Sequence, residues 1–446
     1  MDLDELSQQW IEESKAYVRS INAYVDKGLT EGWDTVGDEP EDTREALAEQ
    51  VLHFVREFNR DGNIAALRSK FPPASDPFHK YIKEGGQGLS SVSLLDDGRI
   101  LVRIGASYEQ GRVVEIDHFE IKERPEIINF GCSSNRVFYA VAKKDGIQVH
   151  KGWDGPVVAE FKWPTGLEDL PPTMQASPLD SPLPVTQLLP FPDGQGVLLV
   201  SSVGLYLLTE NAPRRLLPDL EQIEMEYEET IDEQELDGEE GDIGADQLLS
   251  MDMEHGAISY SGEFIAVGHQ SSSHLIFNRD GHLLGDVGHL SEYPHYAIFS
   301  SDDEMLALNS CHFYNGMTIG FPLKLLPNVD IPPYDLDPRC VELNDGARVY
   351  VGLYRKGEFI IGDALGYLRA FDKNGSFKWQ HYIGSTITAM DVSDDGKTLA
   401  VTSYAGLLCL LNLDTGEQDP FTIGTATHKE FRRWLFWKTE QTPLAW

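Results

Sequence analysis

The chain has 446 residues and carries 73 acidic side chains against 36 basic ones, so its formal net charge is −37 at pH 7. A surface this acidic repels phosphate, and we therefore expect neither nucleic acid nor an anionic membrane among its partners. The chain has no run of about 20 apolar residues, and no apolar core follows its acidic first residues, so neither a membrane span nor a signal peptide is expected.

Residues 1–84 are predicted to form a small helical region. Apolar residues recur at three- and four-residue spacing from Leu6 to Val25, and a second stripe of this kind runs from Leu47 to Phe58. Pro40, with acidic neighbours, suits the first turn of a helix. A region of this size buries too little surface to be stable alone, so we expect it to pack on the rest of the protein.

Residues 85–424 are predicted to form a β-propeller. Seven comparable tight turns recur along this part of the chain, at Gly98, Asn135, Gly194, Gly262, Asp303, Gly357 and Gly396. Three irregular inserts interrupt their spacing, at 164–184, 221–247 and 326–340. Without the inserts the period is about 40 residues, which is typical of a four-stranded propeller blade. The sequence therefore predicts a mainly β fold, a seven-bladed β-propeller with a small N-terminal α-helical region. A strand at either 421–424 or 78–82 would complete a mixed blade and close the ring.

Two of the inserts have a strongly biased composition. Residues 164–184 include six prolines and are predicted to be an extended strap. Residues 221–247 include 13 acidic residues and no Lys or Arg, and their mutual repulsion favours a solvated, disordered loop. Such a loop is a candidate site for a basic protein partner. Its candidate residues are Glu226, Glu228, Glu229, Asp232, Glu233, Glu235 and Asp237.

Six of the 13 histidines fall between His255 and His295. Imidazole nitrogens bind zinc and copper, but the chain shows no His-x-His or His-Glu-x-x-His pair here, and no cysteine joins the histidines. We interpret them as hydrogen-bonded or exposed residues at turns and strand ends, and the sequence leaves open whether they converge on a metal.

Residues 387–417, ITAMDVSDDGKTLAVTSYAGLLCLLNLDTGE, form the clearest repeat unit, with strand patterns separated by Asp-Asp-Gly, Tyr-Ala-Gly and Asp-Thr-Gly turns. This unit resembles a blade of WD40 or YVTN-type propellers, and residues 366–384, GYLRAFDKNGSFKWQHYIG, resemble a quinoprotein-type blade. The resemblance implies a ring-shaped binding scaffold and carries over no partner and no active residue. The chain departs from the WD40 pattern in that the Trp-Asp pair of the propeller region, Trp153-Asp154, lies between two strands.

Residues 425–446 form a basic, Trp-rich C-terminal tail with a net charge of +2. In a helix, Phe431, Trp434, Leu435 and Lys438 would share one side. We expect the tail to act within the molecule as a clasp against the acidic helices or the ring. A docking site for a partner is the second option, and its candidate residues are Arg432, Arg433, Trp434 and Trp437.

The functional expectation is a non-catalytic scaffold for protein–protein interaction, in one version an inhibitor or immunity-type protein that masks a basic partner. The chain lacks a Gly-x-Ser-x-Gly elbow and a phosphate-binding loop, so we assign no catalytic, cofactor-binding or metal-ligating residue. The alternative is a propeller enzyme of the lactonase or hydrolase type, with its site at the central channel. Four widely separated cysteines predict free thiols and a cytoplasmic location.

Overall fold

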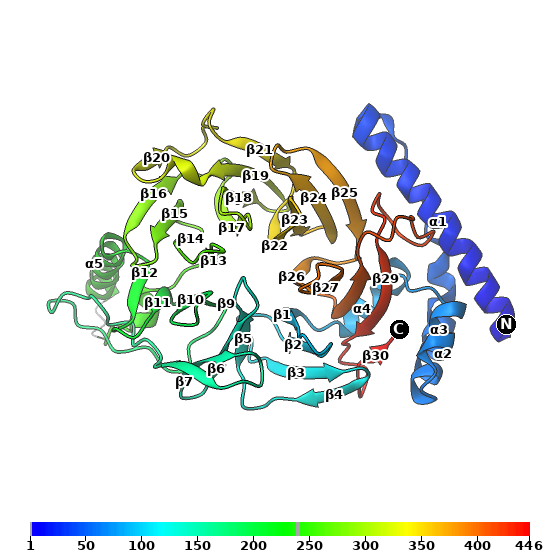
Figure 1. The fold of residues 1–446 in the computed structure, drawn as a ribbon, viewed down its shortest axis with the longest axis horizontal. Coiled ribbons are helices and arrows are strands. Elements are labelled where there is room, and N and C mark those ends of the chain that lie inside the picture. The colour runs from blue at the N-terminus through cyan, green and yellow to red at the C-terminus, as the bar shows by residue number, and fades with distance from the viewer. Residues whose placement is uncertain (1, 238–240) are drawn as a thin grey trace.

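The computed structural model describes residues 2–237 and 241–446 (Figure 1). In these residues, strands form seven sheets arranged as a ring, with helices outside the ring. The predicted seven-bladed β-propeller with an N-terminal helical region is therefore confirmed. No helix of the described residues is both long enough and apolar enough to cross a membrane.

The first three blades follow one another along the chain. Their strands are β1 (Leu89–Leu94), β2 (Ile100–Ile104), β3 (Arg112–Asp117) and β4 (Glu120–Glu123) in blade 1; β5 (Asn129–Cys132), β6 (Phe138–Lys143), β7 (Gly146–Lys151) and β8 (Val157–Phe161) in blade 2; and β9 (Gln187–Pro190), β10 (Val197–Ser201), β11 (Gly204–Leu208) and β12 (Arg214–Leu217) in blade 3.

Blades 4 and 5 share the third insert. Their strands are β13 (His255–Ile258), β14 (Phe264–Gly268), β15 (His274–Asn278) and β16 (Leu283–Val287) in blade 4, and β17 (Tyr293–Phe299), β18 (Met305–His312), β19 (Asn315–Pro322) and β21 (Val341–Asp345) in blade 5. The insert follows the short helix η4 (Leu323–Leu325) and contributes the strand β20 (Val329–Ile331), which pairs in parallel with β16.

The last two blades include the C-terminal residues. Their strands are β22 (Val349–Arg355), β23 (Glu358–Asp363), β24 (Tyr367–Asp372) and β25 (Phe377–Tyr382) in blade 6, and β26 (Ile387–Val392), β27 (Thr398–Ser403), β28 (Leu407–Asn412), β29 (Lys429–Leu435) and β30 (Leu444–Ala445) in blade 7. All seven predicted turns join the first and second strands of their blades. Five of them are glycines with positive φ, a conformation that a Cβ atom disfavours.

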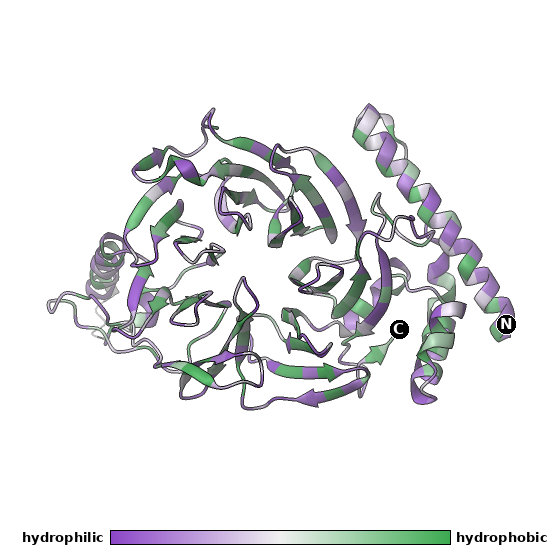
Figure 2. Cartoon of the chain, in the orientation of Figure 1, coloured by the Kyte–Doolittle hydropathy of each residue, from purple (hydrophilic) through white to green (hydrophobic). Residues whose placement is uncertain are grey.

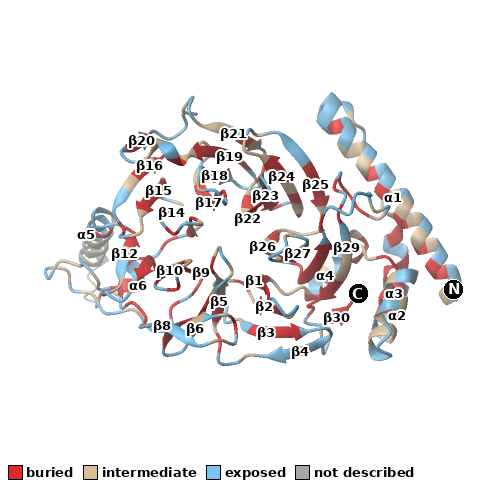
Figure 3. Ribbon diagram, viewed as in Figure 1, coloured by how far each residue is buried: buried red, intermediate tan, exposed pale blue. Residues whose placement is uncertain are grey.

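The core consists of apolar clusters between neighbouring blades. Middle strands such as β10 and β11 are buried along their whole length, because each face of a blade packs against the next blade. Green, hydrophobic residues accordingly follow the strands in Figure 2, and the same stretches are buried in Figure 3. This stacking leaves loops and inner strands to form the two faces and the channel.

The helical region packs outside blade 7, as predicted (Figure 1). Its elements are α1 (Leu3–Glu31), η1 (Trp33–Thr35), η2 (Thr43–Leu47), α2 (Ala48–Arg60), α3 (Ile64–Lys70), η3 (Asp76–Phe78) and α4 (His79–Gly85). Trp10 is fully buried and donates its indole N–H to the carbonyl of Pro72 at 2.8 Å. One core cluster joins Trp10 and Val55 of the helices to Leu399 of β27, so the helices and the last blade form one packed unit.

The ring closes by side-chain contact between its first and last blades. The two predicted alternatives are wrong: 78–82 lies in η3 and α4, and 421–424 adds no strand to a blade. Instead β1 packs beside β26, and Asp391 of β26 accepts a hydrogen bond from the backbone N–H of Leu94 at 2.6 Å. Arg136 of blade 2 pairs with the same carboxylate at 2.5 Å, so one buried ion pair links three blades.

The acidic insert forms a helix, so the predicted disordered loop is wrong. The helix α5 (Leu220–Asp237) is followed by α6 (Ala245–Leu248). Ile223, Tyr227 and Ile231 recur every four residues and give α5 an apolar stripe among its carboxylates. This stripe packs on Leu170 and Leu179 of the proline-rich strap, and that contact supplies the burial that the composition alone did not indicate.

Replacing residues 221–247 with a short Gly-Ser linker is expected to lower the melting temperature. The replacement removes Ile223, Ile243 and Ala245 from a buried cluster and exposes the strap beneath. A buried isoleucine contributes about 1.5–3 kcal/mol, so the pair contributes about 3–6 kcal/mol, which corresponds to a loss of roughly 3–6 °C for a chain of this length. Differential scanning calorimetry measures the shift.

Neutralising six exposed carboxylates of α5 is the matched control, because it removes charge and keeps the packing. The six are Glu226, Glu228, Glu229, Asp232, Glu233 and Glu235, each changed to its amide. An unchanged melting temperature in the linker variant would contradict the packed arrangement.

The tail contributes the strands β29 and β30, so the helix in which Phe431, Trp434, Leu435 and Lys438 would share one side does not form. β29 pairs with β28 in antiparallel register, with Trp434 opposite Leu408, and β30 pairs with β29 in turn. The physical reason is that β28 needs a fourth-strand partner, because an exposed edge would leave a row of unpaired backbone groups. The tail therefore completes blade 7.

Candidate functional site

The central channel contains a cavity of about 480 Å³. Residues from the first strand of every blade line it, and loop residues such as Tyr108, Ser202 and Tyr404 stand at one end. These three lie in loops between the second and third strands of their blades. Because the strands of each blade alternate in direction, all such loops emerge on one face of the ring, and the cavity opens on that face.

Aromatic side chains surround half of this opening. They are Tyr108 of blade 1, Phe313 and Tyr314 of blade 5, Tyr350 of blade 6 and Tyr404 of blade 7, and we call them the aromatic arc. Tyr108, Phe313 and Tyr314 are 79%, 73% and 66% exposed, so most of their ring area is free to contact another molecule. Tyr350 and Tyr404 meet edge to face with ring centroids 6.1 Å apart, which makes the arc continuous between blades 6 and 7.

Arg348 connects the blade 5 part of the arc to the channel. Its guanidinium lies 4.9 Å from the ring centroid of Tyr350 and donates to the carbonyl of Phe313 at 3.1 Å. It also donates to Nε2 of His295 from Nη2, at 3.1 Å. His295 Nδ1 contacts the carbonyl of Val349 at 2.5 Å, so Nδ1 carries the proton and Nε2 is the acceptor.

The opposite half of the opening is acidic. Asp252 and Glu254 lie in the loop before β13, and both line the cavity. Glu254 accepts a hydrogen bond from the hydroxyl of Thr186, and burial raises the pKa of its carboxyl group. Within the part of the chain that the structure describes, neither carboxylate has a basic side chain at ion-pair distance. The opening therefore presents aromatic rings on one side and carboxylates on the other.

The histidines between 255 and 295 do not form a common cluster. His255 and His274 contact each other at 3.4 Å, while His295 bonds to Arg348 and His282 is exposed. No group of three His, Cys, Asp or Glu side chains in the described residues is arranged to hold a metal ion. Burial lowers the pKa of His255 to about 4, and burial together with the charge of Arg348 lowers that of His295 to about 3.

Acidification is expected to destabilise the protein between pH 6.5 and about 4. His255, His295, His381 and His428 have pKa values of about 3 to 4 when folded, so the unfolded chain takes up protons first as the pH falls. Each buried histidine then removes up to about 1.4 kcal/mol of stability per pH unit. Glu254 offsets part of this loss, because its raised pKa favours proton uptake by the folded state.

Urea unfolding at pH 7.5, 6.0 and 5.0 measures this dependence. His381→Gln is expected to reduce the slope of stability against pH, and His118→Gln, which changes an exposed ring, serves as the control. Equal stability at the three pH values would contradict the prediction.

The channel offers no nucleophile activated by histidine among the described residues. Ser91 and Ser93 donate to Asn129 and Asp391, and neither cavity histidine bonds a serine or a cysteine. Burial raises the pKa of Cys132, which also lines the cavity, to about 12 and keeps it a thiol at neutral pH.

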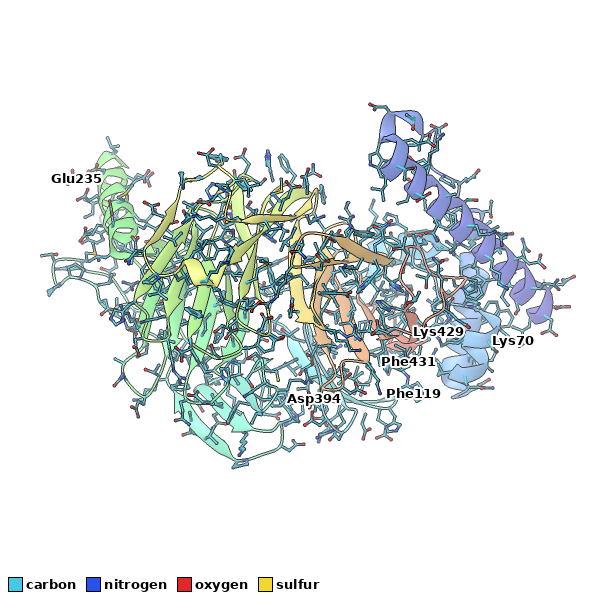
Figure 4. All side chains as sticks on the ribbon, turned by 45° about the horizontal axis from the view of Figure 1, so that its top comes forward. Lys70, Phe119, Glu235, Asp394, Lys429 and Phe431 are labelled. Atoms are coloured by element: carbon cyan, nitrogen blue, oxygen red, sulfur yellow. The ribbon has the colours of Figure 1, made fainter. Side chains whose placement is uncertain are left out.

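The two sets of candidate residues from the sequence lie on opposite sides of the ring. Figure 4 shows Glu235 on α5 at one end of the molecule and Lys429 of β29 across the ring, beside the N-terminal helices. Six of the acidic candidates, Glu226, Glu228, Glu229, Asp232, Glu233 and Glu235, are exposed on α5. Asp237 ends that helix, and its side chain lies outside the described residues. Neither set reaches the channel opening.

The tail candidates are mostly buried. Arg433, Trp434 and Trp437 are at most 5% exposed, and Arg432 lies over the ring of Phe119 at 4.6 Å. The tail does contact the helical region, as the clasp hypothesis predicts. The charges are opposite to those expected, however, because the helices supply the cations: Arg56 pairs with Glu440 at 2.6 Å, and Arg68 pairs with Glu430 at 3.4 Å.

The aromatic arc and Arg348 were absent from the sequence prediction. A signal existed in the blade pattern, because Tyr108, Phe313 and Tyr404 each stand in the turn between the second and third strands of a unit. Aromatic residues in such turns do not fit the small, polar composition that turns usually have. Their meeting around one opening depends on ring closure, which local patterns do not show.

Comparisons with known proteins found solved structures that are similar to this chain at low sequence identity. No family model and no curated protein matches the chain. Among solved structures, the computationally designed Ika8 protein is 14% identical, with 74% of this chain and 97% of that chain covered and a TM-score of 0.42. The Cps50 (Swd1) β-propeller domain of Myceliophteria thermophila is 12% identical, with 70% and 92% covered and a TM-score of 0.45. KlHsv2 with loop 6CD replaced by a Gly-Ser linker is 9% identical, with 78% and 98% covered and a TM-score of 0.42. The chain's own seven sheets establish the β-propeller, and its place among WD40, YVTN or quinoprotein types stays a prediction.

Proposed function

We propose that this protein is a non-catalytic interaction scaffold that binds a basic protein partner over the channel opening. The observation that carries the proposal is the aromatic arc, whose exposed rings stand on one face of a chain with a net charge of −37. Tyrosine and phenylalanine are typical anchors of binding surfaces, because they bury a large area with few rotatable bonds. The acidic field favours a cationic partner on approach.

The acidic half of the opening gives the proposal its second support. Asp252 and Glu254 have no cation beside them in the described structure, so a basic side chain of the partner can pair with them. This protein would then cover the bound surface of its partner, as expected for an inhibitor or immunity-type protein. The cytoplasm is the proposed compartment, a proposal that the four free cysteines support.

The test compares the wild type with an arc variant, Tyr108→Ser with Phe313→Ser and Tyr404→Ser. Proteins captured from the native cell are identified, and association is then measured over a salt series. We expect a basic partner whose association slows steeply with salt and whose binding the arc variant loses by at least about 100-fold. Leu283→Ser with Phe377→Ser is the control, because these exposed residues begin the outer strands β16 and β25.

Three results would overturn the proposal. They are a neutral or acidic partner with salt-independent association, equal binding by the arc variant, and equal losses in the arc variant and the control.

A further inference from the structure

Arg348 stands in the cavity without a carboxylate partner. Two other arginines show the contrast: the buried Arg433 pairs with Glu430 at 2.8 Å, and the partly buried Arg136 pairs with Asp391 at 2.5 Å. The buried Arg103 has no ion pair, but the hydroxyl of Ser90 and backbone carbonyls take its donors. In the described residues no Asp or Glu lies within ion-pair distance of Arg348, although the chain has 73 acidic side chains. The positive charge of Arg348 at the channel opening is therefore not neutralised by a carboxylate of the described residues.

The guanidinium of Arg348 is held in a fixed position. Nε and Nη2 both donate to Nε2 of His295, Nη1 donates to the carbonyl of Phe313, and the ring of Tyr350 supports one face. A guanidinium has five N–H groups, so these contacts leave one donor on each terminal nitrogen. Two such donors are what a carboxylate takes in a parallel, two-point contact.

We infer that Arg348 binds a carboxylate group of the basic partner, either its chain terminus or an Asp or Glu side chain. This inference rests on the proposed function and names the chemistry of its central contact. The carboxylate belongs to a cationic chain in this proposal, because the net charge of −37 would repel a free anion. Asp252 and Glu254 on the far side of the same cavity are placed for the neighbouring basic residues of that chain.

His295 acts as a positioning residue for this contact. Its Nδ1 contact with the carbonyl of Val349 keeps Nε2 unprotonated, and Nε2 then holds two of the guanidinium donors. Arg348 lines the cavity, and a ligand in the cavity can reach its two remaining donors. The neutral imidazole also avoids a second positive charge, which would push the guanidinium away.

Four peptides test the inference by calorimetric titration at low salt. Acetyl-Lys-Gly-Lys-Gly is used with a free C-terminus and as its C-terminal amide. Acetyl-Lys-Glu-Lys-Gly amide carries a side-chain carboxylate, and acetyl-Lys-Gln-Lys-Gly amide is its neutral match. In at least one of the two pairs, the peptide with the carboxylate is expected to bind about tenfold more tightly than the peptide without it. The pair that shows the difference identifies the source of the carboxylate.

Variants assign the difference to the guanidinium. Arg348→Gln is expected to abolish the preference for the acid peptide, and Arg348→Lys to retain part of it. Arg432→Gln is the matched control, because Arg432 also lies over an aromatic ring without a carboxylate partner but stands outside the channel. Melting temperatures within a few degrees of the wild type show that the variants are folded.

Equal binding of acid and neutral peptides by the wild type would overturn the inference, and so would a preference that survives in Arg348→Gln. Acetate or citrate binding as tightly as the acid peptide would assign the site to free anions and also overturn it. Failure of the proposed function is distinguishable, because it appears as the absence of a captured basic protein while the peptide preference remains.

Discussion

Replacing Arg136 with leucine is expected to lower the free energy of unfolding by roughly 3–5 kcal/mol, because it leaves a buried carboxylate unpaired. Arg136 contacts Asp391 at 2.5 Å and Asp394 at 2.5 Å, and its pairing joins blade 2 to blade 7. Asp391 is only 17% exposed, so water does not replace the lost cation. Burial already raises the pKa of Asp391, and the deficit should therefore be smaller at pH 5 than at pH 8.

Denaturant unfolding at the two pH values measures the loss. Arg279→Leu is the matched control: it removes an ion pair with Asp193 whose partners are 41% and 43% exposed, and such pairs contribute about 0–1 kcal/mol. Adding Asp391→Asn to Arg136→Leu should restore part of the stability, because the double variant has no unpaired charge. An equal loss in Arg136→Leu and Arg279→Leu would show that this pair does not hold the ring closed.

Replacing Trp446 with alanine is expected to cost about 3–5 kcal/mol, the range for removing a large buried aromatic residue. Trp446 is fully buried, donates its indole N–H to the carbonyl of Phe71 at 2.6 Å and meets Phe78 edge to face at 5.4 Å. The substitution leaves a cavity and a buried carbonyl without its donor. It also separates the C-terminal strand from the helices, so limited proteolysis should cut the helical region faster.

The control for this experiment is Trp33→Ala, because Trp33 follows α1 and is 53% exposed. We expect it to change the unfolding free energy by less than about 1 kcal/mol. If both tryptophan variants lose the same stability, the tail does not fasten the helices to blade 7.

In the proposed interaction, different residues control how fast the partner associates and how slowly it dissociates. The exposed carboxylates of α5 lie far from the channel opening, at the edge of the ring (Figures 1 and 4). Exposed charges are screened over about 8 Å at physiological ionic strength, so α5 acts on an approaching partner and not on one bound at the channel. Neutralising α5 should therefore slow association and leave dissociation unchanged, whereas changing the aromatic arc should speed dissociation.

The sequence alone determined the number of blades, the positions of their first turns and the helical character of the N-terminal region. These features are encoded locally. A glycine such as Gly98 or Gly396 produces its turn through its own φ angle, and the stripe from Leu47 to Phe58 depends on helical spacing within one segment. Repetition along the chain then indicated the ring.

Only the tertiary structure decided the rest, because each remaining feature depends on residues far apart in the chain. The acidic segment is helical because Ile223 finds an apolar strap to cover, and the tail is a strand because β28 has a free edge. The candidate site has the same origin. Arg348 and Tyr404 come from different blades, and closure of the ring places both at one opening.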